Sequence, residues 1–484
     1  MRISLIKTAD NFTETSIYSS QQNGKGVLTR QHYGEHLGLG YVASVLRQNG
    51  HNVDLMYQLG NMHDFTKRVY DSQPDIVMAT SLTGAFNNTK TIFRNLKDLD
   101  PKIITIVGGD HISGHPKSVD DIAVDFGIVG EGENTSGNLV RVIESGDDPR
   151  VVRGIVYKDP DKGIIVNPPA EPITNLNDLP FPLRTQESTS QTGFSAIFDP
   201  APSKSLPMGI FYTSRGCPYR CKECSSKNTL GTGVRYRNID NVLEEIGEVK
   251  KQFGIKAMTF YDLTFNANRQ HVEDLCHGLI ESGIGLNWYA MTRITNPSGK
   301  PILDKDLLEL MHEAGCRKIA FGIESFDPKV LDYYGKKAEP EQIRETLEQA
   351  DKVGMINRAF FMLGYKDSPE SIKRTLKGLY TCPIHEIRIS ILTPFPGTQF
   401  YDECKEKEGL ITSDWTKYTG DYSILKPSHF SKPSDLMSER EKMFREFMNS
   451  SVYQQRMKEK IARNPGFAEG VEEYFRFLKN KKVI

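Results

Sequence analysis

Two separate series of alternating strand and helix signals constrain the fold of this chain more than any other feature. In the first series, short apolar runs rich in β-branched residues alternate with stretches of helical periodicity. Such alternation is typical of a parallel sheet with helices on both faces. The expected strands are Ile3–Ile6, Val53–Met56, Ile76–Ala79, Ile103–Val107 and Phe126–Val129. Residues 1–150 are therefore expected to form a doubly wound α/β domain.

Five strands of this kind predict a flavodoxin-like order in the first sheet. The second series begins near Met208 and supplies six strand–helix units in residues 207–400. A complete eight-unit barrel usually needs about 250 residues, so six units predict an incomplete (β/α)6 barrel that is open on one side. The expected strands are Gly209–Thr213, Ala257–Tyr261, Leu286–Met291, Arg317–Phe321, Ile356–Met362 and Ile384–Ile391.

The regions between and after the two series have different compositions. Residues 151–206 contain one short strand signal and are rich in Pro, Ser, Thr and Gln, so they are expected to form a linker. Residues 401–484 are charged and helical, with apolar side chains at amphipathic spacing. They are expected to pack on the barrel or to cap its open side.

Composition excludes several classes of partner. The 61 basic and 62 acidic residues give a formal net charge of -1, so no global field favours nucleic acid or an anionic membrane. No apolar run approaches the length of a transmembrane helix, and the first ten residues indicate a strand rather than a signal peptide. The expected location is the cytoplasm, where structural disulfides are disfavoured.

Three of the seven cysteines, Cys217, Cys221 and Cys224, crowd into eight residues directly after the first barrel strand. Active sites of βα barrels lie at this end of the strands. A structural zinc site normally takes four ligands in two pairs, and the next candidates, His271 and Cys276, lie about 50 residues downstream. Three thiolates can instead hold an iron–sulfur cluster and leave one iron open for a non-protein ligand.

The other four cysteines show no second cluster motif and are expected to be buried thiols. The motif Cys-x-x-x-Cys-x-x-Cys after the first strand resembles the radical S-adenosylmethionine superfamily. The resemblance implies a 4Fe–4S cluster whose fourth iron binds the amino and carboxylate groups of S-adenosylmethionine. One electron, from a donor such as flavodoxin or ferredoxin, would then generate a 5′-deoxyadenosyl radical. Glu223 departs from the family, which usually has an aromatic residue before the last cysteine.

Polar residues after three further barrel strands extend the resemblance. Asp262 follows the second strand, Arg293 the third, and Glu324 the fourth, where Gly322-Ile323-Glu324-Ser325 resembles the family's GIES segment. The resemblance implies that Asp262, Arg293 and Glu324 contact S-adenosylmethionine. For Arg293, the fork of the guanidinium suits a carboxylate. The stretch from Leu392 to Thr398 also resembles a segment common in one subgroup.

The first domain, joined to such a barrel, resembles the class of radical enzymes with an N-terminal cobalamin-binding domain. The resemblance implies cobalamin contacts at the loops that follow three strands of this domain, from Ser81, Thr83, Gly108, Gly109 and Glu131. Some cobalamin proteins use Asp-x-His-x-x-Gly to supply a histidine to cobalt. Here Asp and His are adjacent, in Asp110-His111, and follow the fourth strand, so His111 is not expected to be an axial ligand.

These features favour a cobalamin-dependent methyltransferase acting on an unactivated carbon of a small metabolite or natural-product intermediate. A non-methylating radical dehydratase, cyclase or rearrangement enzyme, with an N-terminal domain that binds no cobalamin, is the alternative. A third possibility, a non-catalytic cofactor-binding module, is disfavoured by three cysteines at a barrel mouth. The substrate itself is not encoded in any motif.

Overall fold

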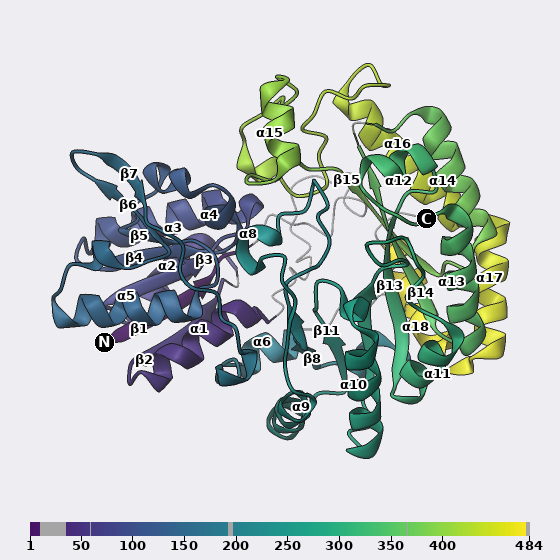
Figure 1. Ribbon diagram of the computed structural model, residues 1–484, viewed down its shortest axis with the longest axis horizontal. Coiled ribbons are helices and arrows are strands. Elements are labelled where there is room, and N and C mark those ends of the chain that lie inside the picture. The colour runs from purple at the N-terminus through teal and green to yellow at the C-terminus, as the bar shows by residue number, and fades with distance from the viewer. Residues whose placement is uncertain (10–34, 59, 192–196, 365, 481–484) are drawn as a thin grey trace.

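The computed structural model describes residues 1–9, 35–58, 60–191, 197–364 and 366–480. The described residues form a seven-stranded sheet, a six-stranded sheet and a two-stranded hairpin (Figure 1). None of the helices in this described part combines the length and apolar character needed to cross a bilayer.

The N-terminal sheet has the order β2-β1-β3-β4-β5-β6-β7, and its first five strands are parallel. This confirms the expected flavodoxin-like doubly wound arrangement. The strands are β1 (Arg2–Lys7), β2 (Asn52–Tyr57), β3 (Ile76–Thr80), β4 (Ile104–Gly108), β5 (Phe126–Ile128), β6 (Ile155–Asp159) and β7 (Gly163–Val166).

Helices cover both faces of this sheet because both faces carry apolar side chains. One face packs against α1 (Leu37–Gln48) and α5 (Glu133–Ser145). The other packs against α2 (Met62–Asp71) and α3 (Phe86–Leu99).

The β6–β7 hairpin departs from the expected domain division. It lies within residues 151–206, which were expected to be linker, but β6 pairs antiparallel with β5 and β7 with β6. Ile155 and Val156 are fully buried, so this hairpin adds to the core of the first domain. The rest of the segment carries the short 3-10 helix Leu176–Asp178 and the short helices α6 (Gln186–Gln191) and α7 (Pro202–Ser205), and it crosses to the barrel.

The second sheet has the order β15-β14-β13-β12-β11-β8 and is entirely parallel. Its end strands β8 and β15 do not pair, which confirms an incomplete six-stranded barrel. The strands are β8 (Met208–Phe211), β11 (Ala257–Phe260), β12 (Asn287–Thr292), β13 (Cys316–Glu324), β14 (Ile356–Leu363) and β15 (Glu386–Ile391).

The barrel helices cover only the outer face of the sheet, and the main hydrophobic core lies between them and the strands. They are α9 (Ile239–Phe253), α10 (Arg269–Glu281), α11 (Lys305–Glu313), α12 (Pro328–Tyr333), α13 (Pro340–Val353) and α14 (Pro369–Thr381). On β14, Ala359 and Phe361 point into this core and are buried, whereas Arg358 and Phe360 point inward and stay partly exposed. The inside of the barrel is therefore not packed shut.

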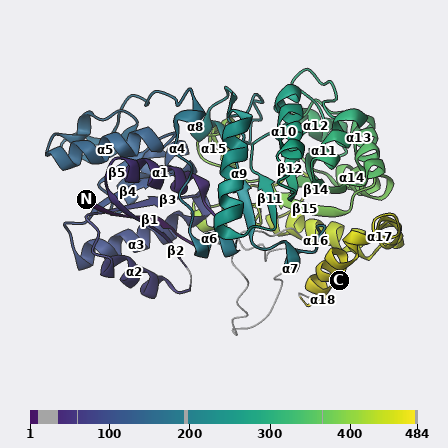
Figure 2. The same cartoon turned by 90° about the horizontal axis from the view of Figure 1, so that it is seen from below.

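The C-terminal helices α16 (Pro433–Asn449), α17 (Ser451–Arg463) and α18 (Ala468–Asn480) pack beside the barrel, as expected (Figure 2). Met443, Phe444 and Phe447 of α16 join the barrel core. The buried Tyr453 hydroxyl of α17 donates to the carbonyl of His385, just before β15, at 2.8 Å. This end of the open sheet is thus covered.

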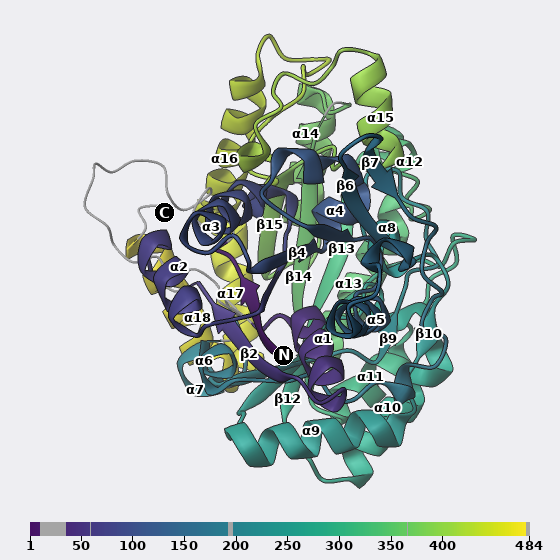
Figure 3. The ribbon, with the colours of Figure 1, turned by 90° about the vertical axis from the view of Figure 1, so that its left-hand side faces the viewer.

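The N-terminal domain lies over the open side of the barrel (Figures 1 and 3). Backbone meets backbone where α4 (Asp110–Gly114) contacts the loop after β15. A Cβ atom on Gly114 would collide with the carbonyl of Pro396, so this close approach requires glycine.

Replacing Gly114 with alanine is therefore expected to lower the free energy of unfolding by about 1–3 kcal/mol, the usual cost of overpacking. Gly247 in α9 provides the control, because a Cβ atom added there would meet nothing within 4 Å and alanine favours the helix. Urea unfolding of both variants measures the difference. Equal stability of the two variants would show that the contact between α4 and the loop after β15 accommodates the added methyl group without a loss of stability.

Candidate functional site

The cysteine loop leaves the barrel at the carboxyl end of β8. It starts from the short strand β9 (Ser214–Arg215), which pairs with β10 (Arg235–Tyr236). Gly216 turns the chain with φ of 91°, and a side chain there would strike the carbonyl of Gly233. Glycine at this position therefore allows the turn that places Cys217 near the carboxyl ends of the neighbouring strands.

Each thiol of the loop has a polar neighbour. The Sγ of Cys217 lies 3.4 Å from Thr264 Oγ1, and that of Cys224 lies 3.0 Å from Ser226 Oγ. Arg293 Nη1 donates to the Sγ of Cys221 at 3.3 Å.

The cysteine loop offers three thiols as possible metal ligands. Among the described residues, no three His, Cys, Asp or Glu side chains converge closely enough to hold a single metal ion. Three thiols on one loop can each ligate a different iron and leave the fourth iron without a protein ligand.

The remaining cysteines are all buried elsewhere in the fold, as expected. They are Cys276 in α10, Cys316 in β13, Cys382 after α14, and Cys404 in α15 (Gln399–Glu406). The cysteine loop thus groups the three cysteines that the motif predicts, and Cys276 and Cys316 are neighbours in the barrel core.

Arg293 lies at the mouth of the barrel next to the cysteine loop. Its guanidinium lies 3.8 Å from the ring centroid of Tyr219, whose hydroxyl donates to the carbonyl of Thr295 at 2.8 Å. This stacking holds the guanidinium in place. The expected contact between Arg293 and a carboxylate of S-adenosylmethionine remains a prediction, and the position of the side chain is compatible with it.

Asp262 is placed differently from the expectation. It is fully buried, and its carboxylate accepts from Thr213 Oγ1 at 2.8 Å, from the Thr213 amide at 3.2 Å and from the Ser214 hydroxyl. Burial raises the pKa of this carboxyl group, while those hydrogen bonds act in the opposite direction. Asp262 therefore anchors the chain that enters the cysteine loop, and this placement favours a supporting role over direct contact with the cofactor.

Glu324 ends β13 in an unusual backbone conformation. Its φ is 71°, in the left-handed region that non-glycine residues rarely adopt, and the pairing of β13 with β14 shifts register there. Its carboxylate pairs with Lys336 Nζ at 3.0 Å and stays partly exposed. Strain of this kind is typical of functional sites, which supports the expected role of Glu324 at the cofactor.

The loops of the N-terminal domain meet at the carboxyl edge of its sheet. Ser81 and Thr83 are buried, and Thr83 Oγ1 lies 3.3 Å from Nδ1 of the buried His111. Gly108 ends β4. Gly109 follows with φ of 95°, and a Cβ there would come within 2.6 Å of Thr80 Oγ1. Glycine at position 109 thus allows the loops after β3 and β4 to approach closely, and the ring of Trp415 lies 5.1 Å from that of His111 at this edge.

Glu131 is engaged in contacts that the sequence did not predict. Its two carboxylate oxygens pair with Arg215 at 3.0 Å and with Arg235 at 2.7 Å, both from the β9–β10 hairpin of the barrel. Glu131 therefore joins the two domains. Its expected contact with cobalamin remains a prediction.

Arg215, Tyr219 and Lys336 were not predicted from the sequence. Arg215 pairs with Glu131, the ring of Tyr219 stacks on Arg293, and Lys336 pairs with Glu324. Arg215 and Tyr219 had a usable signal, since each stands two residues from Cys217. The partners of all three lie 12 or more residues away in sequence, so no local pattern marks the contacts themselves.

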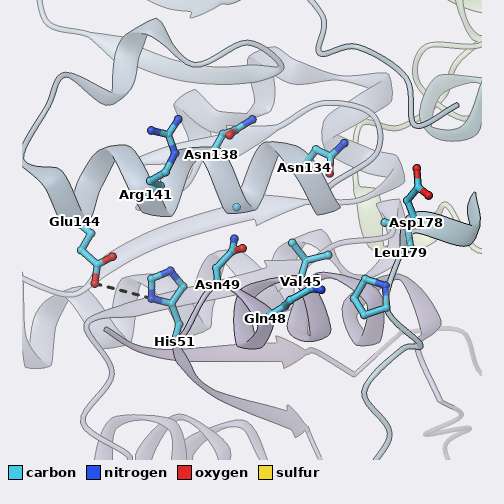
Figure 4. A pocket seen from close by; sticks show the side chains of 12 residues that line it. Val45, Gln48, Asn49, His51, Asn134, Asn138, Arg141, Glu144, Asp178 and Leu179 are labelled. Atoms are coloured by element: carbon cyan, nitrogen blue, oxygen red, sulfur yellow. Dashed lines mark ion pairs between the residues drawn. The ribbon is translucent and has the colours of Figure 1, made fainter. Parts of the chain in front are cut away.

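One groove on the surface lies away from the cysteine loop. It has a volume of about 590 Å³ and follows the seam between α1 and α5 (Figure 4). Its walls include the amides of Asn49, Asn134 and Asn138, and His51 lies 4.0 Å from Glu144 at one end. None of the cysteines, nor Arg293 or Glu324, lines it.

Comparisons with known proteins agree with this architecture. The family model of the B12 binding domain matches residues 25–140, and the model of the Radical SAM superfamily matches residues 211–379. The two matches fall on the two α/β domains described above.

Three similar proteins illustrate the family. An uncharacterized methyltransferase of Pyrococcus horikoshii is 29% identical over 405 residues, 82% of this chain and 84% of that protein. An anaerobic magnesium-protoporphyrin IX monomethyl ester cyclase of Rubrivivax gelatinosus is 26% identical over 424 residues, 86% and 74% of the two chains. Among solved structures, the radical S-adenosylmethionine methyltransferase TsrM of Kitasatospora setae superposes with a TM-score of 0.67 at 18% identity, covering 90% of this chain and 84% of that one.

The order of domains, the two sheet topologies and the three-cysteine loop agree with both family models. The chain therefore combines a domain of the Radical SAM superfamily with an N-terminal B12 binding domain.

Proposed function

We propose that this enzyme is a cobalamin-dependent methyltransferase that acts on an unactivated carbon of a small molecule. One observation carries the proposal: the loop edge of the cobalamin-binding domain is fixed directly against the cysteine loop, through the pairing of Glu131 and Glu133 with Arg215. A methyl donor and a hydrogen-abstracting centre must act on one substrate, so they need such proximity.

The roles of individual residues follow from their positions. When bound, the cluster with S-adenosylmethionine supplies hydrogen abstraction, and cobalamin supplies the methyl group. Cys217, Cys221 and Cys224 would hold the cluster, and Arg293 and Glu324 would orient S-adenosylmethionine. Cys224 is the most exposed of the three cysteines, which suits the approach of an electron donor such as flavodoxin or ferredoxin.

The inner face of the barrel is the proposed place for the substrate. Partly exposed side chains on adjacent strands, among them Met291, Phe360, Met362 and Ser390, line this face. They are mostly apolar, so they can exclude water from a reactive centre and hold an organic substrate by shape.

Cobalamin retention tests the proposal. We expect anaerobically reconstituted protein to keep about one hydroxocobalamin per chain after desalting, together with the absorbance of the cluster. The measurement is the absorption spectrum, with iron and cobalt contents determined on the same sample. Cluster absorbance without cobalt would contradict methyl transfer.

Cluster absorbance without bound cobalt would favour a radical cyclase or dehydratase whose first domain is only a scaffold. The similarity to the Rubrivivax cyclase is the specific observation that supports this alternative function. The two functions differ in product mass, since only the methyltransferase adds a methyl group to its substrate.

A further inference from the structure

Arg215 makes contacts that no motif explains. Its guanidinium reaches across the domain interface with two nitrogens: Nη1 lies 3.0 Å from Glu131 Oε1, and Nη2 lies 2.7 Å from Glu133 Oε1. The same guanidinium lies 4.7 Å from the ring centroid of Tyr41 in α1. One side chain of the barrel thus contacts both the turn after β5 and helix α1 of the N-terminal domain.

The ion pairs around Arg215 are buried. The side chain of Arg215 is 6% exposed, and those of Glu131 and Glu133 are 10% and 4% exposed. Arg235 also pairs with Glu131, through the other carboxylate oxygen. Two arginines therefore face two glutamates. In such a dry environment, removing one charge leaves its partner uncompensated, and the geometry of the group is tightly specified.

The position of Arg215 in the chain gives these contacts a consequence. Arg215 closes β9 and is separated from Cys217 only by the sharp turn at Gly216. Glu131 and Glu133 belong to the turn between β5 and α5, beside the edge proposed to receive cobalamin. A displacement on one side of the interface must therefore move the other side or break a buried ion pair.

We infer that Arg215 is a positioning residue that couples cobalamin binding in the first domain to the cysteine loop of the second. The inference rests on the proposed binding of cobalamin and adds a specific link between the two sites. Coupling of this kind is reciprocal: the loop with its cluster should strengthen cobalamin binding by the same factor by which cobalamin stabilises the occupied loop.

Binding measurements on the full chain test this link without a substrate. Hydroxocobalamin is titrated anaerobically into protein with a reconstituted cluster and into protein stripped of iron, for the unchanged chain and for Arg215→Gln. We expect the cluster to tighten cobalamin binding at least about fivefold in the unchanged chain, within the usual range of coupling, and by less than about twofold in the variant.

A second readout is the electron paramagnetic resonance of the reduced cluster. Cobalamin should alter that signal in the unchanged chain and leave it unaltered in Arg215→Gln. Arg215→Lys keeps the charge but cannot span two carboxylates, so it should show intermediate coupling. If Arg215→Gln does not fold, Glu133→Gln tests the other end of the same pair.

Arg153→Gln is the matched control, because Arg153 also pairs with a glutamate, Glu171, but is exposed and lies far from the cysteine loop. It should keep the full coupling. Equal coupling in the Arg215 variants and the unchanged chain would overturn the inference, as would the absence of coupling in an unchanged chain that binds cobalamin. A chain that binds no cobalamin at all would instead overturn the proposed function on which the inference rests.

Discussion

Replacing Cys221 with alanine is expected to abolish both cluster binding and the cleavage of S-adenosylmethionine. The three thiols of the loop have no substitute among the other cysteines, which are buried in α10, β13 and α15 and after α14. Loss of one of three protein ligands leaves two irons open, and such a cluster cannot keep its shape. We expect at least about a thousandfold loss of 5′-deoxyadenosine formation, which corresponds to about 4 kcal/mol of transition-state stabilisation.

The measurement combines iron content, the visible absorbance of the cluster, and the release of 5′-deoxyadenosine under reducing conditions. Cys276→Ala is the control, since this thiol is fully buried in α10 and lies outside the cysteine loop. The control should keep its iron and its activity, although the lost packing will cost some stability. Unchanged iron content and 5′-deoxyadenosine release in Cys221→Ala would contradict the role of this thiol as a cluster ligand.

The layout of both sheets was predictable because it depends on local patterns. Each parallel strand is a short apolar run between helical segments, and the observed ends of β1, β2 and β3 differ from the expected ones by no more than two residues. The cysteine loop was predictable for the same reason, since its three ligands lie within eight residues. Ligands that are close in sequence are held close in space by the chain itself.

The contacts that assemble the site were not predictable, because they join residues far apart in the chain. Glu131 was expected at cobalamin but pairs with Arg215, which is 84 residues away. Asp262 was expected at S-adenosylmethionine but is buried against Thr213, 49 residues away. The β6–β7 hairpin was assigned to the linker because its one short strand signal gave no indication that β6 pairs antiparallel with β5. An acidic residue at the end of a strand can have several roles, and the contacts made in the folded chain decide which role it has.

A second group of buried charges predicts a large effect on stability. Arg184, from the segment between the domains, pairs with Glu35 of the first domain and with Glu245 of α9. Its side chain is 3% exposed, and those of the two glutamates are 2% and 1% exposed. Arg237 also pairs with Glu245, and Thr189 Oγ1 donates to Glu35 at 3.2 Å, so each glutamate has a second partner.

Replacing Arg184 with methionine should therefore lower the free energy of unfolding by about 3–5 kcal/mol, the usual cost of leaving a buried charge unpaired. Methionine preserves most of the volume, so the loss reports the charge rather than a cavity. The measurement is the midpoint of the first unfolding transition, because a chain of several domains need not unfold in one step. Arg153→Met, at an exposed ion pair, should change stability by no more than about 0.5 kcal/mol.

A double variant separates the charge from other roles of Arg184, which also donates to the carbonyl of Ile210 at 2.9 Å. Arg184→Met combined with Glu35→Met removes both members of one pair, and replacing a buried ion pair with apolar residues is often neutral. We therefore expect the double variant to be more stable than Arg184→Met alone. If it is less stable, the contacts of Glu35 other than its pairing with Arg184 contribute more to stability than the ion pair does.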